Sequence, residues 1–228
     1  ISEDTTSKKI EHKITRETKT TNPNLTQSNN QFIQVDNGTL LGVDHGEGYP
    51  TALVLSKYVS DISSGNFQSG IATPCKSLTF MSLVNDTSIH YNYTGASLGA
   101  FEYSDSAYLI AGTKDTDSTA TTRDVFITSM DKSSGETFTH FYSNYAGTDD
   151  SALTPHLVKT GNNSFILLWS NQGYVYYTAV DGTGQQVGTT HKMAGNLSDC
   201  APIVSNGKAI WYTWKNQFNT FYEISLND

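Results

Sequence analysis

Apolar and aromatic residues occur along this chain in short runs, and turn-forming residues separate each run from the next. The run Ser-Phe-Ile-Leu-Leu-Trp at 164–169, for example, is followed by Asn-Gln-Gly at 171–173 and by Tyr-Val-Tyr-Tyr at 174–177. Strand-forming residues on both sides of a short glycine-containing turn are typical of a β-hairpin. No stretch places apolar residues at helical spacing over three turns between capping residues. The pattern therefore predicts an all-β protein.

The strand pattern repeats along the chain about every 40 to 60 residues, a period that is typical of four-stranded propeller blades. Each repeat has a first strand, a strongly apolar second strand, a third strand and a more polar fourth strand. The last repeat runs out after its third strand. The sequence thus predicts a β-propeller-like fold of about four blades, each of four antiparallel strands, at residues 29–86, 97–146, 155–194 and 200–228.

Residues 1–28 are expected to supply the strand that the last repeat lacks. Within them, Lys-Lys-Ile-Glu-His-Lys-Ile-Thr-Arg-Glu at 8–17 has the polar character of an exposed outer strand. Pairing this N-terminal strand into the last blade, with a linker after it, would close the ring and cover an edge. Residues 1–228 would then form a single propeller-like domain. Two alternatives stay open: the chain is a fragment of a larger protein whose propeller has more blades, or it folds as a β-sandwich.

The composition indicates the setting in which such a protein works. Charged residues make up 16% of the chain, whereas Ser, Thr, Asn and Gln make up 80 of the 228 residues. This balance is below the usual quarter of charged residues and favours a secreted protein at the extracellular surface. The formal net charge of −8 argues against a nucleic-acid partner. Runs of about 18 apolar residues are lacking, which argues against a membrane-spanning helix.

Three stretches carry a resemblance to known proteins. They are Asn-Tyr-Thr-Gly from 92 with Leu-Gly-Ala-Phe-Glu-Tyr-Ser at 98–104, Thr-Pro-His-Leu-Val-Lys at 154–159, and Leu-Ser-Asp-Cys-Ala-Pro-Ile-Val at 197–204 together with Trp211-Tyr212. In general sequence character and in the layout of their repeats, residues 30–226 resemble propeller-like repeat regions of large secreted surface proteins of Gram-positive gut bacteria. The resemblance implies a large exported polypeptide of which this chain is the propeller-like part. It implies no catalytic residues.

One polar loop is a candidate ligand-binding segment. Val-Asp-His-Gly-Glu-Gly-Tyr-Pro at 43–50 brings together the side chains of Asp44, His45 and Glu47, which could bind a ligand or exchange protons. The alternative is an exposed turn between two strands, since its glycines make the loop flexible. No cysteine or histidine stands at metal-site spacing, so we expect no metal and no cofactor. Cys75 and Cys200 form either one disulfide or two buried thiols.

The aromatic residues carry most of the functional information. Trp169 and Trp211 lie on successive second strands, where large aromatic side chains usually fill the space between blades. Strand alternation points Trp211 one way and Trp214 the other. Trp214, near a strand end, and Tyr93, in a loop, are therefore the candidates for an aromatic platform. The C–H faces of sugar rings stack on such platforms while neighbouring polar groups bind their hydroxyls.

These observations predict an extracellular binding module that recognises a carbohydrate or a surface protein without catalysis. Two alternatives come from other classes. A glycoside-active enzyme would use a pair of carboxylates with a raised pKa on one of them. A structural or assembly module would pair its strands with another chain or another segment of a larger polypeptide. The carboxylates considered for the enzyme are Asp44, Glu102, Asp124, Asp199 and Glu223.

Overall fold

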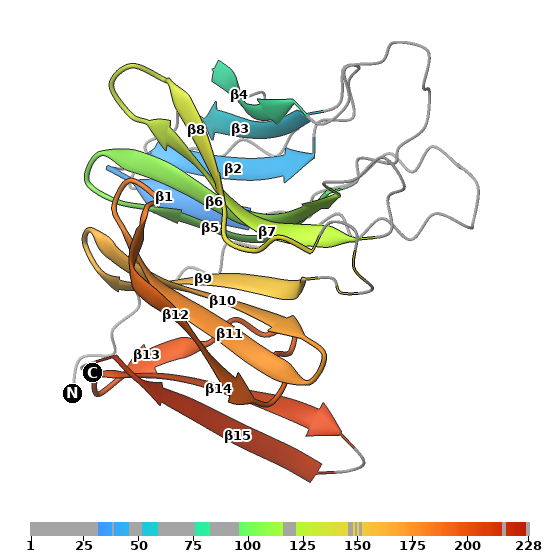
Figure 1. Cartoon of the computed structure of the whole chain (residues 1–228). Coiled ribbons are helices and arrows are strands. Elements are labelled where there is room, and N and C mark those ends of the chain that lie inside the picture. Colours follow the sequence, from blue (N-terminus) through green and yellow to red (C-terminus); the bar gives the residue numbers. More distant parts are fainter. Residues whose placement is uncertain are drawn as a thin grey trace, which may run out of the picture.

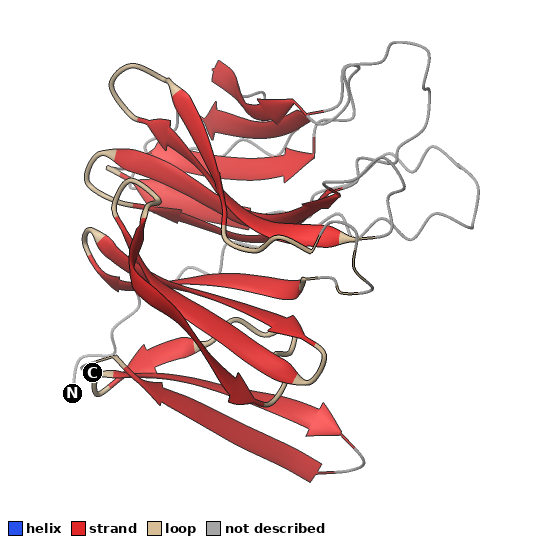
Figure 2. Ribbon diagram, viewed as in Figure 1, coloured by secondary structure: helices blue, strands red, loops and turns tan. Residues whose placement is uncertain are grey.

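The structure is a computed structural model, and it describes residues 32–37, 39–45, 52–58, 76–82, 96–115, 122–145, 148, 150, 152–215 and 218–226. All regular secondary structure in these ranges is β-strand, as Figure 2 shows. The prediction of an all-β protein is therefore confirmed. None of the described residues forms a helix of the length and apolar character needed to cross a membrane.

In the described residues, fifteen strands form four antiparallel sheets, and within each sheet the strands are neighbours in chain order. The first sheet contains β1 (Phe32–Asp36), β2 (Thr39–His45), β3 (Ala52–Tyr58) and β4 (Lys76–Ser82). The second contains β5 (Ala96–Tyr103), β6 (Ala107–Asp115), β7 (Arg123–Asp131) and β8 (Thr137–Phe141). The third contains β9 (Leu153–Gly161), β10 (Ser164–Asn171), β11 (Tyr174–Asp181) and β12 (Gln186–Ala194). The fourth contains β13 (Ile203–Ser205), β14 (Lys208–Lys215) and β15 (Phe218–Ser225).

The tight turns explain why the strands pair in this register. Asn171 pairs with Tyr174, and the two residues between them, Gln172 and Gly173, have φ angles of 46° and 77°. The turn after β13 has the same form, with φ angles of 50° at Asn206 and 70° at Gly207. Two successive positive φ values give the turn a twist that matches the twist of the strands it joins. Local sequence therefore sets the register of both hairpins.

The four sheets are stacked face to face in chain order, as Figure 1 shows. A hydrophobic cluster lies between each sheet and the next. Between the second and third sheets, for example, Leu109 and Ile127 pack with Phe165, Leu167 and Trp169. The two middle sheets bury both of their faces, and for this reason β10 is apolar nearly throughout instead of alternating.

The first strands of the sheets lie next to one another along one side of the stack. β5 contacts β1 on one side and β9 on the other, and β9 also contacts β13. The approach of β5 to β9 is very close, because a Cβ atom at Gly99 would lie 2.0 Å from the carbonyl oxygen of Pro155. Neighbouring first strands around a common axis are a feature of propeller blades.

The stack formed by the described residues is open. Figure 1 places the first sheet at one end and the fourth sheet at the other, and no closed ring is found among the residues that the structure covers. The fourth sheet has three strands there, as the sequence predicts. The N-terminal strand predicted to complete it, within residues 1–28, lies outside the described residues. Ring closure by that strand therefore stays a prediction.

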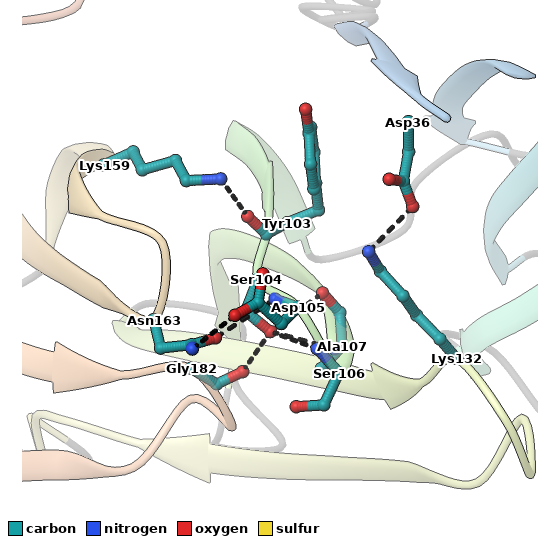
Figure 3. Close-up of polar contacts among 10 residues, drawn as sticks. All are labelled: Asp36, Tyr103, Ser104, Asp105, Ser106, Ala107, Lys132, Lys159, Asn163 and Gly182. Carbon is teal, nitrogen blue, oxygen red and sulfur yellow. Dashed lines mark hydrogen bonds and ion pairs between the residues drawn. The ribbon is translucent and has the colours of Figure 1, made fainter. Parts of the chain in front are cut away.

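Polar contacts between turns hold neighbouring sheets in place (Figure 3). The buried Ser104 hydroxyl donates to the carbonyl oxygen of Gly182 over 2.7 Å, which joins the second sheet to the third. The ammonium group of Lys159 donates to the carbonyl oxygen of Tyr103 at the same junction. Lys132 and Asp36 form an ion pair of 2.7 Å between the second and first sheets. These contacts add directional restraints to the apolar packing.

Candidate functional site

Two tryptophans on second strands occupy equivalent positions in the third and fourth sheets. Trp169 stacks on Tyr176 at a centroid distance of 5.6 Å, and Trp211 stacks on Tyr222 at 5.4 Å. Each indole N–H donates to a residue that comes just before its own sheet in the sequence. Trp169 donates to the Tyr145 hydroxyl, and Trp211 donates to the Asn196 carbonyl oxygen. Both indoles are buried. The interpretation of Trp169 and Trp211 as residues packed between sheets is confirmed.

The opposite side of the fourth sheet carries exposed apolar side chains. Ile203 pairs with Ile210, and Tyr212 pairs with Phe221, so these four residues form two neighbouring rows on one face. We call them the outer face of the fourth sheet. Phe221 is 72% exposed, and Ile203 and Tyr212 are exposed as well. Glu223 pairs with Ile210, so it lies on this face as well, where it forms an ion pair with Lys208.

The third sheet shows how an equivalent face looks when it is covered. Aligned on the Trp–Tyr pairs, Leu168 corresponds to Ile210 and Val175 corresponds to Phe221. Leu168 and Val175 are both 0% exposed, because the fourth sheet packs on them. The outer face of the fourth sheet lies at the end of the described stack, where no described sheet covers it. Its residue types differ from those of the covered face at two positions, because Lys208 and Glu223 stand where the third sheet has Ile166 and Tyr177.

Trp214 lies beyond the part of the hairpin that has a counterpart in the third sheet. The third-sheet hairpin ends with the pair of Asn171 and Tyr174, whereas β14 and β15 continue for two further pairs, the first of which joins Trp214 and Asn219. Trp214 is 68% exposed, and Asn219 is exposed opposite it. We call Trp214 and Asn219 the overhang. Its exposed indole beside an exposed amide is the candidate binding site.

The remaining candidate ligand-binding residues are not brought to this place by the described structure. Tyr93 and Glu47 lie outside the described residues. Asp44 and His45 are the last two residues of β2, paired with Val54 and Leu53, so the strand extends further than the loop expected from position 43. The side chains of Asp44 and His45 are not among those described. Among the residues that are described, no group of three or more His, Cys, Asp or Glu side chains could hold a metal ion.

Three of the carboxylates considered for catalysis have partners within the fold. Asp124 is buried and accepts hydrogen bonds from the Ser143 hydroxyl and the Tyr145 backbone N–H. Glu223 pairs with Lys208. Glu102 accepts a hydrogen bond from the Gln34 amide, and burial raises its pKa while the charge of Lys159 lowers it to a smaller extent. These partners are hydroxyl, amide and ammonium groups, which indicates structural roles.

Cys200 differs from the sequence-based expectation. The sequence suggested a disulfide with Cys75 or a buried thiol, but Cys200 is a free thiol and is exposed in the loop before β13. Its sulfur lies 3.9 Å from the Tyr212 hydroxyl. The interpretation as a buried structural cysteine is wrong, because Cys200 lies in the loop before β13, and no further sheet of the described residues covers that loop. Cys75 lies outside the described residues.

His156 on β9 is a buried titratable residue that the sequence did not single out. Its Nε2 atom lies 2.7 Å from the Ser198 carbonyl oxygen and donates to it in the neutral ring. Burial lowers the pKa of His156 below 6.5, although the hydrogen bond to Ser198 and the charge of Asp199 oppose this shift. The unfolded chain therefore binds more protons than the folded chain in the pH range just below 6.5.

We therefore expect the protein to lose stability as the pH falls through and below about 6.5, with the contribution of His156 fully present above that value. Urea midpoints measured from pH 7.5 to pH 5 for the wild-type chain and for His156→Gln test this. The glutamine amide can still donate to Ser198 but does not titrate. The wild-type midpoint should fall further than that of the variant, and parallel curves would contradict the expectation.

Comparisons with known proteins do not extend the description of this chain. Its fold class is all-β, built from consecutive antiparallel sheets that stack face to face. No family model, no curated protein and no solved structure matches the chain. The overhang and the outer face of the fourth sheet are therefore the features of this chain from which a function is inferred.

Proposed function

We propose that this chain is a non-catalytic carbohydrate-binding module and that its sheets are successive blades of a propeller in an exported surface protein. The propeller proposal is supported by the meander order within each sheet and by the neighbouring first strands. The proposed location rests on the composition, which is poor in charge and rich in Ser, Thr, Asn and Gln, and on the resemblance of the repeats to surface proteins.

The observation that carries the binding proposal is the exposed indole of the overhang. Trp214 is 68% exposed, although large aromatic side chains usually lie inside a folded protein. Its cross-strand partner Asn219 supplies an amide, which can both donate to and accept from a sugar hydroxyl. A flat aromatic surface beside such an amide is the combination that sugar recognition uses, because the C–H face of the ring stacks while its hydroxyls need directional partners.

Hydrolysis of a glycoside is the weaker candidate. It requires a carboxylate pair, with one member protonated near neutral pH. Glu102 has a raised pKa, but its described partners are the amide of Gln34 and the ammonium of Lys159. Glu223, the carboxylate nearest to the overhang in the β15 sequence, is bound in an ion pair with Lys208. These contacts support a binding role without catalysis.

Trp214→Ala should weaken carbohydrate binding about tenfold or more, because losing a stacking contact of about 1.5 kcal/mol has that effect on a dissociation constant. The first measurement is a broad glycan array that includes bacterial wall polysaccharides, followed by titration of each hit. Phe138→Ala is the matched control, since Phe138 is an aromatic residue that is 56% exposed but lies on β8 of the second sheet. Its affinity should stay unchanged.

Three outcomes would count against carbohydrate binding at this place. If the array shows no binding, there is no carbohydrate ligand to support the proposal. Equal losses of affinity in the two alanine variants would show that the binding site is not at the overhang. Unfolding of Trp214→Ala, seen by circular dichroism, would show that the indole stabilises the core and contradict its role as an exposed platform.

A further inference from the structure

We propose that the outer face of the fourth sheet is a docking surface for a further antiparallel sheet of the same repeat type, whose second and third strands carry a stacked Trp–Tyr pair. This inference rests on the proposed propeller arrangement but not on carbohydrate binding. It concerns Ile203, Ile210, Tyr212 and Phe221, and the overhang continues the same face by one cross-strand pair.

Apolar side chains of the outer face are exposed to solvent. The second and third sheets bury apolar side chains on both faces, whereas the fourth sheet is covered on one face only by the described residues. Contiguous apolar side chains on a surface mark a place where another surface binds. Phe221 and Ile210 stand where Val175 and Leu168 are 0% exposed beneath a neighbouring sheet. At these two positions the residue types match those of a covered blade face, whereas Lys208 and Glu223 form an ion pair where the covered face has Ile166 and Tyr177.

The chemistry of the partner follows from the two interfaces at which the pair occurs. At the interface between the second and third sheets, and again between the third and fourth, the later sheet contributes the stacked pair. The indole packs on the earlier sheet, as Trp211 does with Leu168 and Val175. Its N–H is satisfied by a group that precedes its own sheet, so burying the indole leaves no unpaired donor. A sheet with this pair would fit the outer face in the same way.

A second copy of this chain is not the partner that these interfaces indicate. Both Trp–Tyr pairs found in the described residues are already buried inside the stack, at Trp169 with Tyr176 and at Trp211 with Tyr222. A second copy could offer neither of them without unfolding. In the part of the chain that the structure describes, the first and second sheets pack without such a pair, so the pair is a feature of the two later interfaces. By continuity with these two interfaces, the occupant is a sheet from outside the described residues, with its own pair, as another segment of a larger propeller would provide.

The test appends a second copy of residues 195–228 after Asp228, which places a sheet with a Trp–Tyr pair next in the chain. Phe221 in the original repeat is replaced by cysteine in a background of Cys75→Ser and Cys200→Ser, and the appended copy of Cys200 is replaced by serine as well. If the appended sheet docks, labelling of the Phe221→Cys thiol by a maleimide should slow by about tenfold or more relative to the unextended chain. The matched control carries Asp in place of the tryptophan in the appended copy of position 211, and its thiol should label at the unextended rate.

Each result of the labelling experiment either supports or overturns the docking surface. Slow labelling in the extended chain alone supports the docking surface. Equal rates in both extended chains, whether the appended sheet docks elsewhere or stays unfolded, overturn it. Sedimentation of the unextended chain provides a second measurement: a dimer that Phe221→Asp converts to a monomer would show that a second copy is the occupant and would overturn the proposal as well.

The two proposals fail in different experiments. Carbohydrate binding is measured on the unextended chain through Trp214→Ala, whereas docking is measured on the extended chain through the Phe221→Cys thiol. A blank glycan array for the unextended chain together with a protected Phe221→Cys thiol in the extended chain would reject the sugar site and keep the docking surface. Glycan binding together with an unprotected Phe221→Cys thiol would keep the sugar site and reject the docking surface.

Discussion

Trp169→Ala should lower the free energy of unfolding by about 3–5 kcal/mol, the usual cost of removing a large aromatic side chain from a core. Trp169 is one of the largest fully buried side chains, and it packs between the second and third sheets against Leu157, Val180 and Tyr176. Its removal leaves a cavity that rigid sheets on both sides cannot close. A domain of this size is usually stable by about 5–15 kcal/mol, so the variant should approach unfolding.

Urea denaturation followed by far-ultraviolet circular dichroism measures this loss, and Trp169→Phe is the matched control. Phenylalanine keeps a ring next to Tyr176 but cannot donate to the Tyr145 hydroxyl. Its loss should be about 1–2 kcal/mol, from the missing hydrogen bond and the smaller ring. Equal losses for the alanine and phenylalanine variants would show that packing of the indole is not the main contribution.

Gly99→Ala should lower the free energy of unfolding by about 3 kcal/mol or more, because the added methyl group has no room. Its carbon would lie 2.0 Å from the carbonyl oxygen of Pro155 and 2.4 Å from the Pro155 ring. The first of these contacts involves backbone, so β5 and β9 would have to separate. Because these are neighbouring first strands, the substitution disturbs the packing of the second sheet on the third.

Gly135→Ala separates this steric effect from the general cost of replacing glycine. Gly135 has a φ angle of 77°, and a Cβ atom there would meet nothing within 4 Å. Only backbone strain is expected, at about 1–2 kcal/mol. Thermal unfolding of both variants is the measurement. A loss at Gly99 no larger than the loss at Gly135 would contradict the close approach of β5 to β9.

The sequence predicted the strands well because their signals are local. The hairpin of β10 and β11 was expected from the apolar run ending at Trp169 and from the Asn-Gln-Gly turn, and its positive φ values at Gln172 and Gly173 show the reason. The grouping into repeats with a three-stranded last unit was predicted for the same reason. Closure of the ring could not be established from such local signals, because it depends on contacts between segments far apart in the chain.

The candidate site was predicted in part. Strand alternation separated Trp211 from Trp214, and the structure places the first inside and the second at the surface. The sequence analysis did not predict that the outer-face residues, Phe221 among them, form one surface. The cross-strand register that brings them together is that of the β14–β15 hairpin. The buried position of His156 and the exposed position of Cys200 could not be inferred, because each depends on whether a neighbouring layer covers it.

The positions of the strands and turns and the side chains that share a face could be predicted from the amino-acid sequence, since each of these properties depends on residues a few positions apart. Which faces are covered depends on how the sheets pack in space. Val175 and Phe221 occupy equivalent places, yet one is buried and the other is 72% exposed. The difference arises because burial is determined by the next sheet in the stack and not by the strand that carries the residue.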